Sequence, residues 1–328
     1  MSTPAPLVEL DDVSKRFVKK ADVAARLLNV FGARHRDEVV HAVDGVSFSI
    51  AKGEIVGLVG ESGCGKSTVG RLVADIFRPT TGTIRHDGAD ARATGGPGLS
   101  VQMIFQDPFS SLNPRKRVGD TIAEAPRVHG VVPRPEIDDY VAATMERCGL
   151  DPAVRGRFPH QFSGGQRQRI GIARALAVKP RLLVCDEAIA ALDVSIQAQI
   201  LNLFLDLKDQ FALTYLFISH DLGVVEHMSD RVIVMYLGRI VESAPSAELF
   251  ARPNHPYTRA LLAEVPRLSR RKQRFEPVKG EIPSPLDPPG GCHFHPRCPF
   301  ATKRCAEERP LPREVAPGHV SACHLNDA

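Results

Sequence analysis

A short run of residues decides the fold, and it reads Gly60-Glu61-Ser62-Gly63-Cys64-Gly65-Lys66-Ser67. The run matches the pattern G-x-x-x-x-G-K-[ST], in which glycines let the backbone wrap closely around phosphate oxygens and expose amide groups to them. The hydrophobic segment 54–59 precedes the run and an apolar helical pattern follows it, so we predict a strand, a loop and a helix. In this arrangement Lys66 reaches the β- and γ-phosphates of a nucleotide and Ser67 binds Mg²⁺.

The whole run is predicted to contact the nucleotide. A glycine turn with an incidental lysine would not explain why every position of the pattern and both flanking segments agree with it. Cys64 occupies a variable position and receives no chemical role of its own. The predicted nucleotide-binding residues here are Gly60, Glu61, Ser62, Gly63, Cys64, Gly65, Lys66, Ser67 and Thr68.

Length and composition indicate an ordinary globular chain. It has 328 residues, 43% of them hydrophobic and 24% charged, enough for one large α/β domain or two smaller ones. The formal net charge of +4 is too small to argue for nucleic acid as a partner. No apolar run approaches a bilayer span, and residues 1–10 lack the pattern of a secretory signal, so we expect a cytosolic protein whose cysteines do not form disulfides.

Strand-like and helix-like segments alternate along most of the chain, which predicts an α/β fold with a mainly parallel sheet. Between 107 and 165 the signals are mostly helical and broken by prolines, so we expect an inserted helical subdomain there. The segment 18–40 reads as an insertion with an amphipathic surface helix whose role stays open. The expected strands are 8–17, 42–50, 54–59, 100–105, 182–185, 214–218 and a pair across 231–242, and the expected helices include 136–148, 166–178 and 195–210.

Two carboxylates end the predicted strand 182–185. Acids at a strand end are often only solvated, but beside a phosphate loop Asp186 can bind Mg²⁺ and Glu187 can orient and deprotonate the attacking water. Cys185 is expected in the core. These features alone leave kinases, GTPases, helicases and transport ATPases open.

The segment Phe162-Ser163-Gly164-Gly165-Gln166 separates these classes. Ser163 is a good helix N-cap, and the two glycines expose amides of the helix N-terminus to an anion. A capped helix explains the serine but not two glycines and a glutamine in this order between the two nucleotide motifs. Here the chain resembles the ATP-binding cassette (ABC) ATPases, whose signature is Ser-Gly-Gly-Gln, and the resemblance extends over about 8–266.

The resemblance implies a fold and further nucleotide contacts. The family has a P-loop NTPase core, an antiparallel β subdomain and an inserted helical subdomain. Phe17 stands where an aromatic ring stacks on adenine, and Gln106 where a glutamine touches Mg²⁺ or its water. Asp193 belongs to a loop that crosses the dimer interface, in which Ala190 replaces a common serine. His220 stands where a histidine contacts the γ-phosphate.

The resemblance also implies a mechanism shared between two chains. Two cassettes pack head to tail, so that Ser163, Gly164 and Gly165 of one, with Gln166 beside them, cap the ATP bound by the other. A single chain is therefore expected to hydrolyse ATP poorly. The implied catalytic residues are Lys66, Gln106, Glu187 and His220, and the implied Mg²⁺ ligands are Ser67, Gln106 and Asp186.

Finer features resemble the oligopeptide/dipeptide (and nickel) importers, at residues 42–48, 106–114, 255–258 and 280–285. The insertion and residues 235–238 look like the second of the two paralogous ATPases of such importers. This implies a heterodimer with a paralogous ATPase, two membrane permease subunits, an extracytoplasmic solute-binding protein, and a place on the cytoplasmic face of the membrane. A soluble ABC ATPase acting on nucleic acid or ribosomes is the alternative, and nickel or another small solute the alternative cargo.

The C-terminal part differs in character, which divides the chain into an ATPase domain, 1–265, and an extension, 266–328. The extension has a basic stretch at 267–274 and so many prolines that we expect no regular helix or sheet. Its spacing Cys292-x5-Cys298-x6-Cys305-x17-Cys323 lacks the pairs of a zinc ribbon. The spacing resembles that of the C-terminal extension of peptide-importer ATPases, some of which bind a [4Fe-4S] cluster through four cysteines, and the resemblance implies such a cluster here. Zinc, with help from His293, His295, His319 or His324, and four free thiols remain the alternatives.

Overall fold

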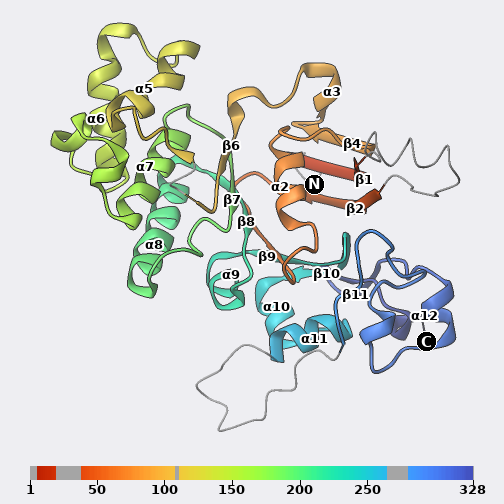
Figure 1. Cartoon of the computed structure of the whole chain (residues 1–328). Coiled ribbons are helices and arrows are strands. Elements are labelled where there is room, and N and C mark those ends of the chain that lie inside the picture. Colours follow the sequence, from red (N-terminus) through yellow and green to blue (C-terminus); the bar gives the residue numbers. More distant parts are fainter. Residues whose placement is uncertain (1–5, 20–37, 108–110, 264–279, 328) are drawn as a thin grey trace, which may run out of the picture.

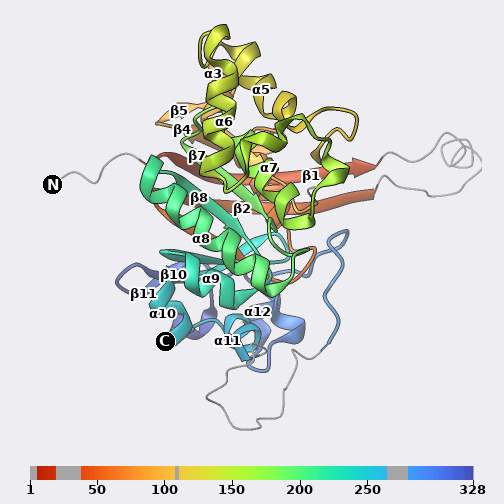
Figure 2. The ribbon, with the colours of Figure 1, turned by 90° about the vertical axis from the view of Figure 1, so that its left-hand side faces the viewer.

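A computed structural model describes residues 6–19, 38–107, 111–263 and 280–327 of the chain. The strands form two sheets, one of four strands in the order β2-β1-β4-β5 and one of eight in the order β11-β12-β10-β9-β3-β8-β7-β6. Figure 2 shows the helices of the predicted insertion and the C-terminal region on opposite sides of the sheets. No helix in the described ranges is long and apolar enough to cross a bilayer.

Five neighbouring strands of the larger sheet are parallel, as the alternating pattern predicts. Both faces of these strands are covered, because alternate residues belong to two different hydrophobic clusters. Ile55 and Val59 pack with the helices after β7, whereas Val56 and Leu58 pack with α2 and the smaller sheet. The strands are β3 (Ile55–Val59), β6 (Val101–Ile104), β7 (Leu182–Asp186), β8 (Thr214–Ile218) and β9 (Arg231–Tyr236).

The three helices whose bounds the sequence predicts, 136–148, 166–178 and 195–210, begin and end within two residues of those positions. They are amphipathic, and their apolar sides fill the clusters on the two faces. The helices are α2 (Lys66–Val73), α6 (Ile137–Arg147), α7 (Gly164–Leu176), α8 (Val194–Phe211) and α9 (Leu222–Met228). The predicted insertion contains α5 (Val118–His129) and α6, and both lie with α7 at one end of the molecule (Figure 1).

The smaller sheet is antiparallel, as expected, but larger than the sequence indicates. Strands β1 (Val8–Lys19) and β2 (Glu38–Ile50) continue beyond the expected segments as a ribbon without buried residues, which includes the pair Val18 and Val39 and ends at the pair Lys19 and Glu38. The helix expected over 18–40 falls mainly on 20–37, outside the described residues, and 18–19 and 38–40 are strand. Strand β4 (Thr81–His86) was not predicted, because Ile84 is its only buried residue; β5 (Ala89–Asp90) completes the sheet.

The expectation that prolines prevent regular structure in the extension is wrong. Strand β12 (His319–Ser321) pairs with β10 (Arg239–Pro245), and β11 (Arg313–Ala316) pairs with β12, so the extension continues the central sheet. Prolines do not interrupt these strands, because Pro310, Pro312 and Pro317 precede or separate them. The extension also contains α12 (Lys303–Glu307), and its basic stretch at 267–274 lies outside the described residues. Helices α10 (Ser246–Ala251) and α11 (Pro256–Ala263) precede the extension.

A buried carboxylate joins the extension to the sheet. Glu242, on β10, is 1% exposed and accepts hydrogen bonds from the backbone amides of Asn254 at 2.7 Å and His255 at 2.9 Å. The Nε2 atom of His319, also buried, lies 2.6 Å from the same carboxylate. Such a buried group is stabilising only while its partners are present.

We expect His319→Ala to lower the free energy of unfolding by about 1–3 kcal/mol, because the buried Glu242 loses a hydrogen-bond partner. Denaturant unfolding followed by circular dichroism measures the change. The same substitution at His227, which is exposed on α9, is the control and should have little effect. Equal stability of the two variants would contradict the assigned role of His319.

Candidate functional site

The predicted phosphate loop joins β3 to α2. Helix α2 begins after Gly65, which has a φ of 106° and offers no side-chain cap, so the first amides of the helix are available to an anion. Two loop glycines are required by space. A Cβ atom on Gly60 would lie 2.2 Å from the carbonyl oxygen of Met235, and one on Gly65 would lie 2.2 Å from that of Ala42. The remaining loop residues therefore follow a path that the glycines fix.

Lys66 lies inside this loop rather than in solvent. Its side chain is buried, and its Nζ atom donates to the carbonyl oxygens of Gly60 at 2.7 Å and Glu61 at 3.0 Å. The ammonium group is therefore held where the loop curls around it, close to the amides of the helix start. Cys64 is also buried, and burial raises the pKa of its thiol, which agrees with a packing role.

A carboxylate and a hydroxyl meet beside the start of α2. The Oγ atom of Ser67 donates to Oδ1 of Asp186 at 2.7 Å, and Asp186 ends the buried strand β7. Burial raises the pKa of Asp186, although the hydrogen bond from Ser67 opposes this. Oxygen atoms of this kind are the ligands that Mg²⁺ prefers, so these two side chains fit the predicted metal role.

The second acid has an unusual backbone conformation. Glu187 has a φ of 50°, in the left-handed region that non-glycine residues rarely adopt, and its amide donates to the carbonyl oxygen of Ile218 at 3.0 Å. Its Oε1 atom lies 3.3 Å from Nδ1 of His220, which follows β8. Such strained conformations cluster at functional sites, because surrounding contacts must hold them in place.

The order of the strands explains why these residues meet. In the parallel part of the sheet the neighbours run β3, β8, β7 and β6, so all four carboxyl ends lie at one edge. Strand β3 leads to the phosphate loop, β8 to His220, β7 to Asp186 and Glu187, and β6 to Gln106. Gln106 is exposed at this edge. Ligands of open α/β sheets bind outside such edges.

The predicted adenine contact lies on the smaller sheet. Phe17 is half-buried on β1 and packs edge to face with Phe77, with ring centroids 5.3 Å apart. The Nζ atom of Lys15 lies 5.2 Å from the Phe17 ring centroid and 5.6 Å from that of Phe77. Phe77 and Lys15 were not predicted, since nothing in their local sequence indicates that they meet Phe17.

The signature residues lie elsewhere in the same chain. Ser163 caps α7, with its Oγ accepting from the Gln166 amide at 3.3 Å and Gln166 Oε1 accepting from the Ser163 amide at 3.0 Å. A Cβ atom on Gly165 would lie 2.6 Å from Ile196, whereas one on Gly164 would meet only Leu192, at 3.7 Å. Packing within the chain therefore explains why residue 165 is a glycine, but it does not explain the glycine at position 164.

Figure 1 shows α7 among α5, α6 and α8, whereas α2 lies next to the smaller sheet. The signature segment thus belongs to the helical part of the chain, and its exposed Ser163 and Gly164 present the helix start to the outside. Asp193, the N-cap of α8, is also exposed, and Val194 beside it is 82% exposed. Ala190, where the serine is missing, is exposed as well.

The phosphate loop has contacts with the C-terminal region that the sequence did not predict. The guanidinium group of Arg297 binds both carboxylate oxygens of Glu61, at 2.7 and 2.9 Å. The amide of Glu61 also donates to the hydroxyl group of Tyr257, on α11, at 2.9 Å. No local pattern could reveal these contacts, because about 200 residues or more separate the partners.

The four C-terminal cysteines line one small cavity together with His255, His295 and His324. Burial raises the pKa of Cys292 to about 11 and also raises the pKa values of Cys298 and Cys323. Nevertheless, within the described part of the chain no three histidine, cysteine or acidic side chains are close enough together to hold a single metal ion.

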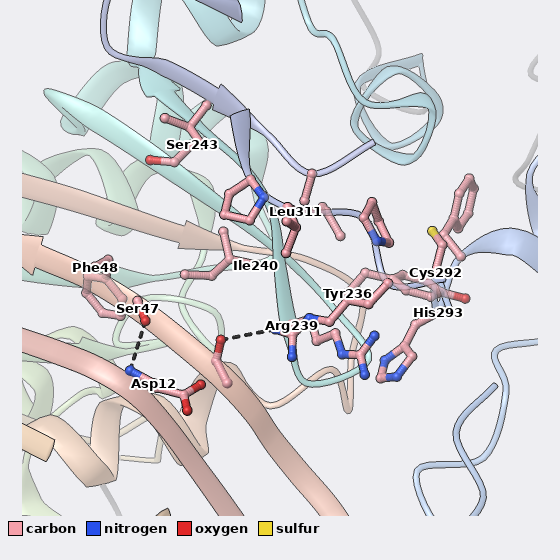
Figure 3. Close-up of a pocket in the computed structure, with 18 of the residues that line it drawn as sticks. Asp12, Ser47, Phe48, Tyr236, Arg239, Ile240, Ser243, Cys292, His293 and Leu311 are labelled. Carbon is pink, nitrogen blue, oxygen red and sulfur yellow. Dashed lines mark hydrogen bonds between the residues drawn. The ribbon is translucent and has the colours of Figure 1, made fainter. Parts of the chain in front are cut away.

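A larger cavity, of about 540 Å³, lies between the extension and the strands of the cassette. In Figure 3, Cys292, His293 and Leu311 of the extension face Arg239 and the β2 residues Ser47 and Phe48. The charges here are partly satisfied, since Arg239 binds Asp44 at 2.7 Å. This cavity contains none of the predicted nucleotide-binding residues.

Comparison with known proteins agrees with the geometry. The family model described as "ABC transporter" matches residues 43–190, and the model described as "Oligopeptide/dipeptide transporter, C-terminal region" matches residues 241–305. The oligopeptide transport ATP-binding protein AppF of Bacillus subtilis is 49% identical over 328 residues, covering 97% of both chains. A putative peptide import ATP-binding protein of Brucella ovis is 51% identical, covering 90% of this chain and 97% of its own length.

Among solved structures, CbiO1 of Clostridium perfringens, part of the ABC transporter complex CbiONQ, matches with a TM-score of 0.62. It is 25% identical and the match covers 75% of this chain and 91% of CbiO1. The predicted fold class, a P-loop core with an antiparallel β subdomain and a helical insertion, is thereby confirmed. The chain belongs to the ABC transporter family, as an ATP-binding subunit with the oligopeptide/dipeptide transporter C-terminal region.

Proposed function

We propose that this chain is the ATP-hydrolysing subunit that energises import of oligopeptides or dipeptides through separate membrane permease subunits. The observation that carries the proposal is the sheet edge at which Lys66, Asp186, Glu187 and His220 meet. The names of the relatives, which refer to oligopeptide transport and peptide import, support this cargo over nickel and do not favour a role on nucleic acid or ribosomes.

Each residue at the edge has a proposed role in hydrolysis. The phosphate loop with Thr68 binds ATP, and Lys66 neutralises its β- and γ-phosphates. Glu187 deprotonates the attacking water, while His220, 3.3 Å away, orients that carboxylate and contacts the γ-phosphate. Ser67, Asp186 and Gln106 would hold Mg²⁺, which when bound offsets the charge of the phosphates. Phe17 would stack on the adenine ring.

Hydrolysis is proposed to need a second cassette. Helix α7, which Ser163 caps, lies apart from α2 in Figure 1, so the exposed Ser163 and Gly164 suit the nucleotide of another chain. The exposed Asp193 is proposed to belong to the same interface. We propose a paralogous ATPase as the partner, in a heterodimer at the cytoplasmic face of the membrane, with the helical insertion around 107–165 contacting the permeases.

We expect ATP hydrolysis to become peptide-dependent only in the complete importer. The test is co-expression of this chain with a paralogous ATPase, two permease subunits and a peptide-binding protein, followed by phosphate release in proteoliposomes with and without peptide. The isolated chain should hydrolyse ATP slowly. A stable, fully active homodimer would contradict the heterodimer, and stimulation by nucleic acid instead of peptide would contradict the importer.

We expect Glu187→Gln to lower the rate of ATP hydrolysis by a factor of about 10² or more, because the attacking water loses its base. Nucleotide affinity, measured by equilibrium binding, should stay close to that of the unmodified complex. Glu307→Gln, at an exposed position of α12, is the matched control and should hydrolyse ATP normally. Unchanged hydrolysis in the Glu187 variant would remove this residue from the mechanism.

We also propose that Cys292, Cys298, Cys305 and Cys323 bind a [4Fe-4S] cluster of structural or regulatory role, the alternative being Zn²⁺. The four side chains line one cavity, which suits a group bound by four thiolates. A zinc ion would need its donors around one point, and in the described residues they are not gathered so tightly. The shared cavity and the spacing of the four cysteines in the sequence are the support for the proposal.

Protein purified without oxygen should therefore be brown and contain iron and acid-labile sulfide in equal amounts. Replacing Cys298 or Cys305 with serine should lower the iron content, because each removes one ligand. Cys148→Ser, at a buried position of the helical insertion, is the control and should keep it. Colourless protein with one equivalent of zinc would support the alternative site.

A further inference from the structure

The strongest contact between the C-terminal region and the phosphate loop is the pair of Arg297 and Glu61. Two hydrogen bonds join them, Nη1 to Oε2 at 2.7 Å and Nη2 to Oε1 at 2.9 Å. Only 5% of the Arg297 side chain and 20% of the Glu61 side chain are exposed. The hydrogen bonds with Glu61 raise the pKa of Arg297. A bidentate pair this well shielded from water differs from an ordinary surface ion pair, which contributes little.

Glu61 occupies a sensitive place in the loop. Its carbonyl oxygen accepts from Lys66 Nζ at 3.0 Å, and its amide donates to the hydroxyl group of Tyr257 at 2.9 Å. Its carboxylate is a negative charge on a loop whose amides and lysine are arranged for the phosphates of a nucleotide. Without a cation beside it, this charge would repel the nucleotide that the loop binds.

Packing fixes Arg297 in place. Phe294, three residues earlier in the chain, is buried and packs against Tyr236 and Tyr257, with ring centroids 5.2 and 5.4 Å away. The guanidinium carbon lies 5.8 Å from the centroid of Tyr236, and Nη1 lies 3.4 Å from its hydroxyl group. The arginine is thus presented to the loop by a rigid aromatic cluster.

We propose that Arg297 is a positioning residue of the nucleotide site, which acts through Glu61 by neutralising its carboxylate and holding it away from the phosphates. The proposal rests on the proposed role of residues 60–67 in binding ATP. It makes the C-terminal region part of the nucleotide site of its own chain. Affinity for ATP then depends on a segment that the cassette motifs do not include.

The test is the dissociation constant of a fluorescent ATP analogue with Mg²⁺, measured on the isolated full-length chain. Arg297→Gln should raise this constant about three- to tenfold, because the Glu61 charge is left unpaired. Adding Glu61→Gln to that variant removes the charge and should restore the constant to within about twofold of the unmodified chain. Arg297→Lys keeps a positive charge and should bind better than the glutamine variant.

The matched control is Arg313→Gln, the same change in the same region, where the arginine binds Asp327 at 3.0 Å instead of the loop. Its dissociation constant should equal that of the unmodified chain. Thermal unfolding of each variant separates lost affinity from lost folding. If Arg297→Gln alone does not fold, the double variant is compared with Glu61→Gln, and because the charge of Glu61 is absent from both, their dissociation constants should be equal.

Two results would overturn the proposal: unchanged affinity in a folded Arg297→Gln variant, or a double variant that binds as weakly as the single one. The second result would mean that the arginine supports the structure without acting on the charge of Glu61. An unmodified chain that binds no nucleotide would instead contradict the proposed role of the loop itself, so the two failures are distinguishable.

Discussion

Burial of the parallel strands on both faces is the constraint on which the rest of the structure depends. Strands β3, β7 and β8 are buried along their whole length, so polar chemistry has no place within them. The polar, functional side chains therefore lie where the strands end. Because the strands are parallel, their carboxyl ends all lie at one edge of the sheet. The glycine loop, the two acids and His220 are therefore neighbours, although more than a hundred residues separate some of them in the sequence.

The local patterns predicted this cassette well, because its chemistry depends on local rules. Periodicity gave β8 with its observed bounds, and the glycine, acid and capping motifs mark strand ends or helix starts. Strand β4 was missed because it has a single buried residue, and the added pairs of β1 and β2 were missed because none of their residues at 18–19 and 38–41 is buried. These elements are stabilised by pairing with other strands, which periodicity does not report.

The extension was misjudged for a different reason. Proline content indicates that a segment does not form regular structure by itself. Strand β12 forms nevertheless, because it pairs with β10. In the same way, the residues next to Arg297 and His319 in the sequence do not indicate their roles. These roles depend on contacts with Glu61 and Glu242, which are distant in the sequence. Interactions between charged side chains that are distant in the sequence are therefore the part of this site that could not be predicted from one sequence.

The place of β11 and β12 in the sheet also bears on solubility. They cover the edge of β10, whose backbone amides and carbonyls could otherwise pair with a strand of another molecule. The outermost strand is β11, and its charged residues Arg313 and Glu314 are exposed to solvent. The extension thus works as a guard against edge-to-edge association. In a cell, a chain released before its last residues are made would carry an open template for aggregation.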